Sequence, residues 1–415
     1  MNEKSYASSD RAKCWSDINF TKAEAHVKKL QQRIFNACYY AEYDKLDSLS
    51  HMMIHSFYAK ALAVKHVCST HGKHTPGVDN IIWESDDEKF NAIFGLHRRG
   101  YKASPLKRAY IKKTDGRTRL LGIPTMQDRA MQSLYAFALE PIAECLADDH
   151  SYGFRPKRCA QDAVDYVIKY LAKSNPQWVL KADIRSCFDN ISHDWLLKNV
   201  PMDKMILRTF LECGYMSHDT IYPTRHGVPQ GGCLSNILCN LTLDGLEHTL
   251  LQNVDAKMAF VRYADDIIIF ADTSGLLGQA VLPVVEKYLS ERGLSLSNEK
   301  SGIFSVKEGF YYLGWHIYKS DNQIISVPSR QAVDTFLEKI MIIVSQEHFF
   351  SDKELLNRLK SVIWGWLYYY KTATPPSLNG IEFEVISNVY QLTGSPLLVK
   401  HIENEFYLYY KNKMD

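Results

Sequence analysis

Long apolar runs are missing from this chain of 415 residues. No stretch approaches the roughly eighteen consecutive apolar residues that a membrane-spanning helix needs. The first residues (MNEKSYASSDRAKCW) also lack the apolar core of a signal peptide. We therefore expect a cytoplasmic protein that has no membrane partner.

Paired cysteines and a strong net charge are missing as well. The nine cysteines include no CxxC pair and no regular spacing, which favours reduced thiols without disulfides. A net charge of +2 is too small to indicate a nucleic-acid partner by itself. What the chain does contain is 46% apolar residues, which is enough to build a large globular core.

Positive charge is concentrated between residues 97 and 119. One acid, Asp115, stands there against nine bases: Arg98, Arg99, Lys102, Lys107, Arg108, Lys112, Lys113, Arg117 and Arg119. A run of charge is usually a solvated surface, but beside other nucleic-acid signals it indicates phosphate contact. Three later bases could extend the basic track: Arg155, Lys157 and Arg158.

The most informative segment is FVRYADDIIIF, residues 260–270, in which Asp265 and Asp266 are adjacent between two apolar runs. The β-branched and aromatic residues on both sides predict two strands joined by a tight turn. Neighbouring carboxylates repel each other, so a cation is expected, and hard oxygen ligands favour Mg²⁺ or Mn²⁺ over zinc. The alternative is a solvated acidic turn, which is common.

A third acid, Asp183, ends another short apolar run, residues 178–184, which leads through a turn into a helix starting near Ser192. Because Asp183 is far from Asp265 in the sequence, the acids meet only if their strands are neighbours in the fold. Three acids could then hold two cations about 4 Å apart, as in polymerases. The alternative is an ordinary aspartate at a strand end.

Residues 226–247 (HGVPQGGCLSNILCNLTLDGLE) pass from a glycine-rich turn into an amphipathic helix. Gly231 and Gly232 leave the backbone open, so a planar ligand can approach it closely. Gln230 can hydrogen-bond a base or a sugar. A Gly-Gly helix entry alone would be a weak signal.

Taken in order, these segments resemble the motifs of reverse transcriptases, most closely those encoded by bacterial group II introns. The resemblance spans about 240 residues, from 74 to 317. Its other segments are HTPGVDN (74–80), YIKKTDGRTRLLGIPTMQDRAMQ (110–132), SYGFRPKRCAQDAV (151–164), LSLSNEKSGIF (294–304) and FYYLGWHI (310–317).

The resemblance implies an α+β protein with the right-hand polymerase fold. We expect a helical N-terminal extension (1–73), fingers with the start of the palm (74–177), a palm with an antiparallel sheet packed on helices (178–318) and a helical thumb (319–415). In the thumb, apolar spacing predicts helices over residues 333–344 and 353–370. Its aromatic run, residues 364–370, is expected to be mostly core.

The resemblance also assigns roles to single residues. Asp183, Asp265 and Asp266 match catalytic acids, and the Ile184 carbonyl matches a further metal ligand. The implied cofactor is a pair of Mg²⁺ ions, with Mn²⁺ as an alternative. Lys300 matches a lysine that could protonate pyrophosphate, although a solvated surface lysine explains it equally well.

The nucleotide pocket is implied in the same way. Phe188 matches a bulky gate that excludes a ribose 2′-hydroxyl and so favours dNTPs, while the plainer interpretation is a core phenylalanine. Lys113 and Arg119 match residues that grip the triphosphate, and Gln230 and Gly231 should line the pocket. Three further residues are expected to bind nucleic acid: Arg155, Lys157 and Gly314.

The region before residue 74 reads as helical and could bind template or RNA. Apolar residues recur there at helical spacing: Val27, Leu30, Ile34 and Cys38. A local set resembles a zinc site at first glance: His66, Cys68, His71 and His74. Its spacing is compressed for a zinc site, and a histidine-rich loop near phosphate explains the set equally well.

Three functions stay open. The first is an RNA-directed DNA polymerase of antiphage defence, which copies a cognate structured noncoding RNA from a primer into cDNA with dNTPs. The second is an intron-encoded maturase, and the third is an RNA-dependent RNA polymerase, against which Phe188 argues. No Cys/His-rich endonuclease tail follows the thumb, which favours the first. Asn236 replaces the family's usual proline, and a homo-oligomer is compatible with the sequence.

Overall fold

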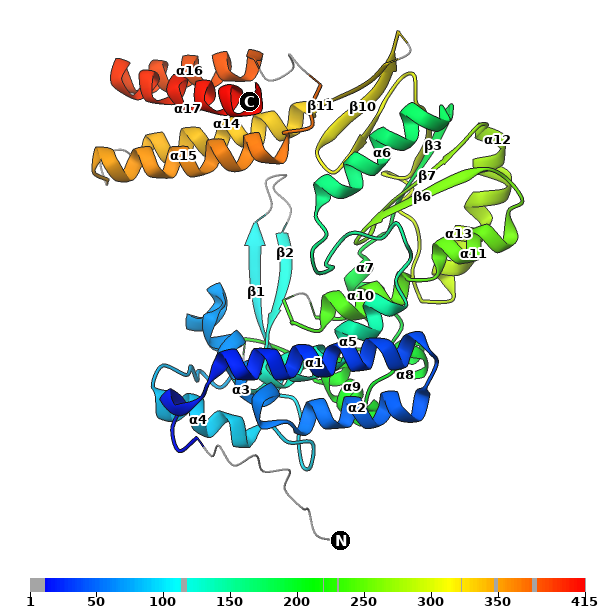
Figure 1. Cartoon of the computed structure of the whole chain (residues 1–415), viewed down its shortest axis with the longest axis vertical. Coiled ribbons are helices and arrows are strands. Elements are labelled where there is room, and N and C mark those ends of the chain that lie inside the picture. Colours follow the sequence, from blue (N-terminus) through cyan, green and yellow to red (C-terminus); the bar gives the residue numbers. More distant parts are fainter. Residues whose placement is uncertain are drawn as a thin grey trace. The chain divides into compact units, whose positions relative to one another are not determined.

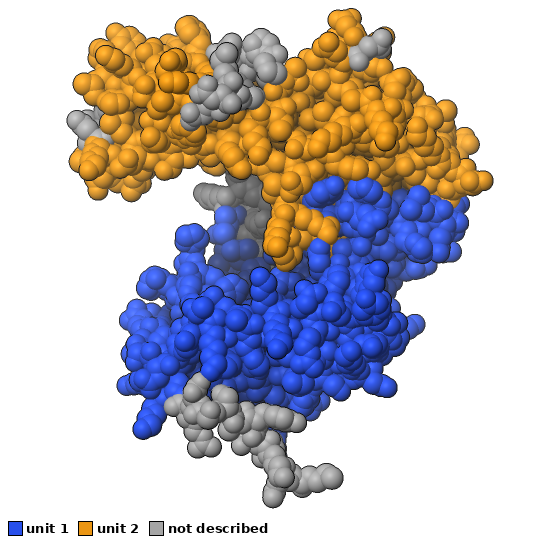
Figure 2. Space-filling view, in the orientation of Figure 1, with its two compact units in different colours: residues 1–154, 184–253, 284–297 blue, residues 155–183, 254–283, 298–415 orange. Residues whose placement is uncertain are grey.

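The structure, a computed structural model, describes residues 12–112, 118–218, 220–229, 231–321, 323–346, 350–374 and 379–414. The chain forms two compact units, which are coloured separately in Figure 2. Unit 1 consists of residues 1–154, 184–253 and 284–297, and unit 2 of residues 155–183, 254–283 and 298–415. Each unit therefore brings together segments that are far apart in the sequence.

The N-terminal part of unit 1 is helical (Figure 1). Its elements are η1 (Trp15–Asp17), α1 (Phe20–Tyr39), α2 (Tyr43–His55), α3 (Phe57–Ser69), η2 (His71–His74) and α4 (Asp86–Gly95). Val27, Leu30 and Ile34 are buried along one face of α1, and Cys38 is partly buried, which confirms the predicted helical spacing. The side chain of Asn19 caps the first turn of α1.

The long helix α5 (Met126–Cys145) forms the centre of unit 1. It contacts α1, α2, α3 and α10, and most of its residues are buried. The helices that follow are α7 (Cys187–Asn190), α8 (His193–Asn199), α9 (Lys204–Glu212), α10 (Ser235–Leu243) and α11 (Leu246–Asn253). A sheet of order β2-β1-β4-β5 completes the unit, with β1 (Leu106–Lys112), β2 (Thr118–Ile123), β4 (Tyr215–Ser217) and β5 (Thr220–Tyr222).

Unit 2 contains an antiparallel sheet of order β6-β7-β3-β8. Its strands are β3 (Trp178–Asp183), β6 (Met258–Tyr263), β7 (Asp266–Ala271) and β8 (Gly302–Ser305). Residues 267–271 of β7 are all buried, because helix α6 (Ala160–Ser174) contacts β6 and the π-helical segment η3 (Leu277–Val281) contacts β3 and β7. Two further helices flank η3: α12 (Ser274–Leu276) and α13 (Leu282–Ser290).

The C-terminal part of unit 2 begins with a second antiparallel sheet, β9 (Phe310–Tyr312), β10 (Trp315–Ser320) and β11 (Gln323–Pro328). Four helices follow: α14 (Arg330–Ser345), α15 (Asp352–Tyr369), α16 (Asn379–Thr393) and α17 (Pro396–Met414). Helix α14 contacts α15 and α16, and α17 contacts α15 and α16. The two helices predicted for this region are confirmed as α14 and α15.

The observed mixture of helices and antiparallel sheets agrees with the predicted α+β class. The helices before residue 74 and after residue 329 lie where they were expected. The boundaries of the four-part division stay a prediction, because the compact units follow other limits. Within the residues that the structure describes, no helix is both long and apolar enough to cross a membrane.

Candidate active site

The acids predicted to be catalytic come together at one end of the β6-β7-β3-β8 sheet. Strand β3 runs antiparallel beside β7, and their register pairs Asp183 with Asp266. On its other side β7 pairs with β6, which places Tyr263 opposite Asp266 and leaves Ala264 and Asp265 as a two-residue turn. Directly opposite residues project from the same face of a sheet. The strand adjacency that the sequence left open is therefore present.

Asp266 has a strongly raised pKa. Burial raises its pKa to about 6, the charges of Asp183 and Asp265 add to the effect, and Lys181 and Lys300 oppose it. The buried Oδ1 atom of Asp266 has no hydrogen-bond partner among the described residues. A buried, unpartnered carboxylate oxygen is costly unless a cation or a donor satisfies it.

Asp183 is held by the two residues that precede β8. The Ser301 hydroxyl accepts a hydrogen bond from the Asp183 backbone N–H at 3.1 Å and donates one to its carbonyl at 3.2 Å. The ammonium of Lys300 lies 3.5 Å from Asp183 Oδ1. Because Lys300 is half exposed, it can also meet a ligand that arrives from solvent. The structure thus brings Lys300 to the acids, as the sequence predicted.

These residues fit a hard divalent cation. The side-chain ligand atoms of the three acids are carboxylate oxygens, which Mg²⁺ and Mn²⁺ prefer. A bound ion would also give the Oδ1 atom of Asp266 the partner that it lacks. Among the described residues, no group of three or more His, Cys, Asp or Glu side chains is already arranged as a metal site. Ile184, the predicted carbonyl ligand, follows Asp183 and is buried. Its backbone forms an isolated antiparallel β-bridge with Leu296.

Phe188, the predicted gate, lies on the short helix α7 in unit 1. Its side chain is 8% exposed and packs edge-on against Phe154, with the ring centroids 6.1 Å apart. Its carbonyl accepts a hydrogen bond of 2.6 Å from the Val228 backbone N–H. The ring is therefore firmly held, which suits both a core residue and a gate.

Several residues predicted to bind the nucleotide cannot be placed in the site. Lys113 and Gln230 lie outside the described residues. Arg119 belongs to β2, of which only the backbone is described at this position, and it pairs with Ile111. Gly231 has a φ of +109°, which favours glycine, and a Cβ atom there would lie 3.4 Å from the carbonyl oxygen of Gly122 in β2. The glycine turn therefore approaches the β1–β2 hairpin.

The structure divides the basic run of residues 97–119 into paired and unpaired charges. Arg98 forms an ion pair with Asp203, and the Arg108 guanidinium lies over the ring of Tyr215. Arg99 and Lys102 are exposed, and neither has a partner within the described part of the chain. Among the described side chains of this run, Arg99 and Lys102 are therefore exposed charges that no acid neutralises.

The two predicted contacts at residues 155 and 157 differ. Arg155 is 6% exposed, so its guanidinium is not part of an exposed basic track, and its expected phosphate contact is not supported. Lys157 is exposed and has a φ of +61°. Of the predicted histidine-rich loop, His66 lies instead in helix α3, and it contacts the Ser133 hydroxyl at 3.0 Å, which accounts for that side chain without a metal.

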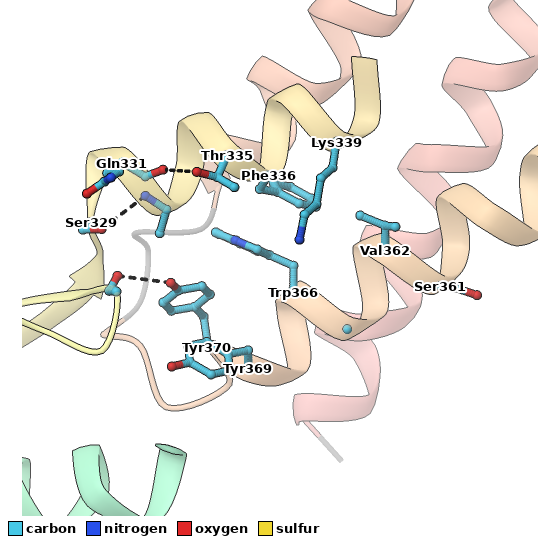
Figure 3. A pocket seen from close by; sticks show the side chains of 13 residues that line it. Ser329, Gln331, Thr335, Phe336, Lys339, Ser361, Val362, Trp366, Tyr369 and Tyr370 are labelled. Atoms are coloured by element: carbon cyan, nitrogen blue, oxygen red, sulfur yellow. Dashed lines mark hydrogen bonds between the residues drawn. The ribbon is translucent and has the colours of Figure 1, made fainter. Parts of the chain in front are cut away.

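Gly314, the third predicted nucleic-acid contact, lines a pocket of about 570 Å³ between α14 and α15. Figure 3 shows Trp366 lying across this pocket between Phe336 and Tyr370, with the Lys339 ammonium pointing into it. Trp366 stacks on Phe336 with the ring centroids 4.6 Å apart, and the Tyr370 hydroxyl donates to the Gly314 carbonyl at 3.1 Å. Most of these aromatic side chains pack in the helices, as predicted.

Two residues that contact the acids or their turn were not identified from the sequence. Ser301 gave no signal, because a serine beside a lysine is ordinary. Arg262 lies within the segment FVRYADD, inside the predicted apolar strand, yet it is completely buried and donates a hydrogen bond to the Ala264 carbonyl at 3.1 Å. A lone arginine in an apolar strand is a signal that could have found it.

Comparison with protein families gives two matches. Residues 111–317 match the family described as reverse transcriptase (RNA-dependent DNA polymerase). Residues 15–96 match the family described as N-terminal domain of reverse transcriptase. Together the two matches cover more than two thirds of the chain, and the first includes the three acids, Lys300 and the glycine turn.

Individual relatives agree with these matches. The chain is 34% identical over 217 residues to the group II intron-encoded protein LtrA of Lactococcus lactis, a match that covers 50% of this chain and 35% of LtrA. It is 27% identical to protein YkfC of Escherichia coli, covering 62% and 80% of the two chains. Maturase-like protein 1 of Euglena gracilis is 25% identical, covering 88% and 80%. The chain thus spans about a third of LtrA.

Proposed function

Because the chain belongs to the reverse transcriptase family, we propose that it is an RNA-directed DNA polymerase with the right-hand fold, which extends a primer with dNTPs on a structured RNA template. The observation that carries the proposal is the pairing of Asp183 with Asp266 on adjacent strands, with Asp265 in the turn between β6 and β7. The family implies dependence on a divalent metal, for which we propose two Mg²⁺ ions, with Mn²⁺ as an alternative.

The three acids and the Ile184 carbonyl would hold these ions. Bound there, Mg²⁺ would favour ionisation of the primer 3′-hydroxyl and stabilise the leaving pyrophosphate. The chain's own contribution is to hold like charges together: the register of β3 and β7 fixes Asp183 and Asp266 side by side, and Ser301 holds the Asp183 backbone. Preorganised carboxylates need no rearrangement at the moment of reaction.

Lys300 and Phe188 supply the remaining proposed roles. Lys300 lies 3.5 Å from Asp183 and is half exposed, so its ammonium can donate a proton to pyrophosphate as it leaves. Phe188 is rigidly packed, and a rigid ring can discriminate by shape against a ribose 2′-hydroxyl. We therefore expect dNTPs to be preferred over rNTPs.

Extension of a DNA primer on an RNA template by the purified full chain tests this function. Asp265→Ala should abolish extension in Mg²⁺ while leaving RNA binding nearly unchanged, because the substitution removes a metal ligand from a turn and leaves the β6–β7 pairing in place. Asp272→Asn, which alters an exposed acid just after β7, is the matched control and should keep activity. Substantial synthesis by Asp265→Ala would refute the catalytic assignment. In the same assay Phe188→Val should raise rNTP incorporation, and an unchanged preference would place the gate elsewhere.

The biological role is proposed separately from the chemistry. Copying of a cognate noncoding RNA in antiphage defence is the role suggested by the sequence. A role in intron splicing and mobility is the second candidate, and it is favoured by the names of the relatives, which are intron-encoded and maturase-like. Sequencing of the nucleic acids that co-purify with the protein separates the two. One abundant RNA with complementary DNA that is absent from Asp265→Ala supports defence, and intron RNA without such DNA supports the maturase.

A further inference from the structure

The β6–β7 hairpin that carries two of the acids contains a fully buried charge. Arg262 is 0% exposed in a strand whose other residues are mainly apolar. It pairs with Ile267 of β7, and the next pair along is Tyr263 with Asp266. Because successive side chains alternate between the faces of a sheet, Arg262 projects from the face opposite Asp266. A buried guanidinium is tolerated only where it is paired or hydrogen-bonded.

The turn between these strands has an uncommon conformation. Ala264 has a φ of +56°, whereas Asp265 is not among the residues with positive φ. A two-residue hairpin with positive φ at its first position only is typical of the type II′ turn, in which that position favours glycine. An alanine there is strained, and the conformation persists only where its surroundings hold it. Ala264 is 5% exposed, so its surroundings are protein.

The arginine reaches this strained residue directly. Arg262 Nη1 donates a hydrogen bond to the Ala264 carbonyl at 3.1 Å. That carbonyl belongs to the peptide group that joins Ala264 to Asp265, so the bond fixes the orientation of the peptide plane that leads into the first acid. A hydrogen bond from a charged donor is stronger than a neutral one. The bond can therefore offset the strain at Ala264.

We propose that Arg262 is a positioning residue of the active site. By holding the Ala264 carbonyl from the opposite face of the sheet, it keeps the strained turn in the conformation that presents the carboxylates of Asp265 and Asp266 to metal ions. The role rests on the proposed function, since it presupposes that these acids bind metal. It goes beyond that function, because Arg262 touches neither the metal nor the substrate.

Arg262 could instead only stabilise the fold. A substitution at Ala264 separates this role from the positioning role. Glycine adopts positive φ without strain, so Ala264→Gly should let the turn form without help from the arginine. If Arg262 acts through the turn, its removal should matter much less in the Ala264→Gly protein. If Arg262 only stabilises the fold, its removal should cost the same in both proteins.

The experiment measures Mn²⁺ affinity by the electron paramagnetic resonance of free Mn²⁺, the Mg²⁺ concentration that gives half-maximal primer extension, and Tm. Four full-length proteins are compared: wild type, Arg262→Gln, Ala264→Gly and the double variant. Loss of a partner that orients metal ligands typically lowers metal affinity about 10- to 100-fold, and we expect a loss of this size for Arg262→Gln. In the Ala264→Gly background the same change should cost less than about a third of that factor.

Arg292→Gln is the matched control. Arg292 also donates hydrogen bonds to backbone carbonyls, those of Thr242 and Tyr288, at 2.8 Å each. Neither carbonyl belongs to the acidic turn, so the loss of Arg292 should lower Tm without changing Mn²⁺ affinity. Should Arg262→Gln not purify, Arg262→Lys replaces it, because lysine keeps the charge and loses the planar fork. It should show the same pattern with a smaller loss.

Each outcome separates this proposal from the proposed function. Equal losses of Mn²⁺ affinity in the two backgrounds, or no loss at all, would overturn the role of Arg262. Mn²⁺ binding that is lost in Asp265→Ala, without any primer extension by the wild type, would refute the polymerase function and leave the role of Arg262 standing. Mn²⁺ binding that is unaffected by Asp265→Ala would refute the metal site and with it this proposal.

Discussion

Asp266 is the residue at which stability and function oppose each other. Burial, reinforced by two neighbouring acids, raises its pKa from 3.8 to about 6. The folded protein therefore holds this proton more tightly than the unfolded chain does. From the unfolded value to the folded one, between about pH 4 and pH 6, the free energy of unfolding falls as pH rises. Above that window the penalty is on the order of 3 kcal/mol.

Asp266→Asn should accordingly abolish primer extension and raise Tm. At pH 8 in EDTA the amide removes the penalty of an ionised, buried carboxylate, so we expect Tm a few degrees above that of the wild type. At pH 5 the gain should shrink to about half in free energy, because the wild-type acid is then largely protonated. Thermal unfolding at the two pH values measures both effects.

Asp272→Asn, which changes an exposed acid beyond the other end of β7, is the control and should leave Tm unchanged at both pH values. Mg²⁺ should raise the Tm of the wild type, because the ion neutralises the buried carboxylate of Asp266. It should not raise the Tm of Asp266→Asn, which lacks that carboxylate. An Asp266→Asn protein that is no more stable than the wild type at pH 8 would contradict the proposed electrostatic cost.

The sequence identified some residues of the site and missed others for physical reasons. Asp265 and Asp266 stand out because adjacent acids between apolar runs have few explanations. Arg262 carries a comparable signal, a charge inside an apolar strand, but its hydrogen bond to the carbonyl of its own turn is not visible in the sequence. The role of Ser301 depends on how β8 lies beside β3, and no local pattern encodes that.

At the scale of elements, local periodicity predicted several helices and strands near their observed bounds. Helices expected over residues 333–344 and 353–370 are α14 (Arg330–Ser345) and α15 (Asp352–Tyr369). The sheet order β6-β7-β3-β8 could not be predicted from residues alone. Pairing of distant strands depends on packing across the whole unit, so the meeting of Asp183 with Asp266 was an expectation drawn from family resemblance.

Helix α15 is joined to the turn between β9 and β10 by two tyrosine hydroxyls. Tyr369 donates to the Leu313 carbonyl at 2.9 Å, and Tyr370 donates to the Gly314 carbonyl at 3.1 Å. Both turn residues have positive φ, +49° and +81°, so this turn, like the acidic one, is held in place by its neighbours. The tyrosine near the Gly314 carbonyl is visible in Figure 3.

Replacing both tyrosines by phenylalanine should loosen the contact between α15 and the turn. Each hydroxyl is worth about 1 kcal/mol, and the rings keep their packing. If Gly314 binds nucleic acid, as predicted, the Tyr369→Phe, Tyr370→Phe protein should release primer–template sooner and give shorter products, with a nearly unchanged rate of single-nucleotide addition. Extension in the presence of a heparin trap measures product length.

Tyr368→Phe is the matched control, because Tyr368 is the adjacent residue of α15 and is 61% exposed. It should give products of wild-type length. Equal product lengths for the control and the double variant would show that the turn is held without the hydroxyls or does not contact the primer.

At the scale of the whole molecule, a net charge of +2 understates the potential for binding nucleic acid. What matters is which positive charges have no acidic neighbour. Arg98 is paired with Asp203, whereas Arg99 and Lys102 are exposed without a partner in the described residues. Two bases that are neighbours in the sequence should therefore contribute unequally to RNA affinity.

The salt dependence of RNA binding measures that difference. Each phosphate neutralised on a single strand contributes about −0.7 to the slope of log Kobs against log salt concentration. If Arg99 and Lys102 contact phosphates, the Arg99→Gln, Lys102→Gln protein should have a slope shallower by about 1.4 than the wild type. Arg98→Gln removes a charge that Asp203 already neutralises and should change the slope much less. Fluorescence anisotropy of labelled single-stranded RNA over a NaCl series gives these slopes. Equal changes in slope for the two variants would contradict the prediction, because they would mean that the ion pair with Asp203 does not keep Arg98 from contacting the RNA.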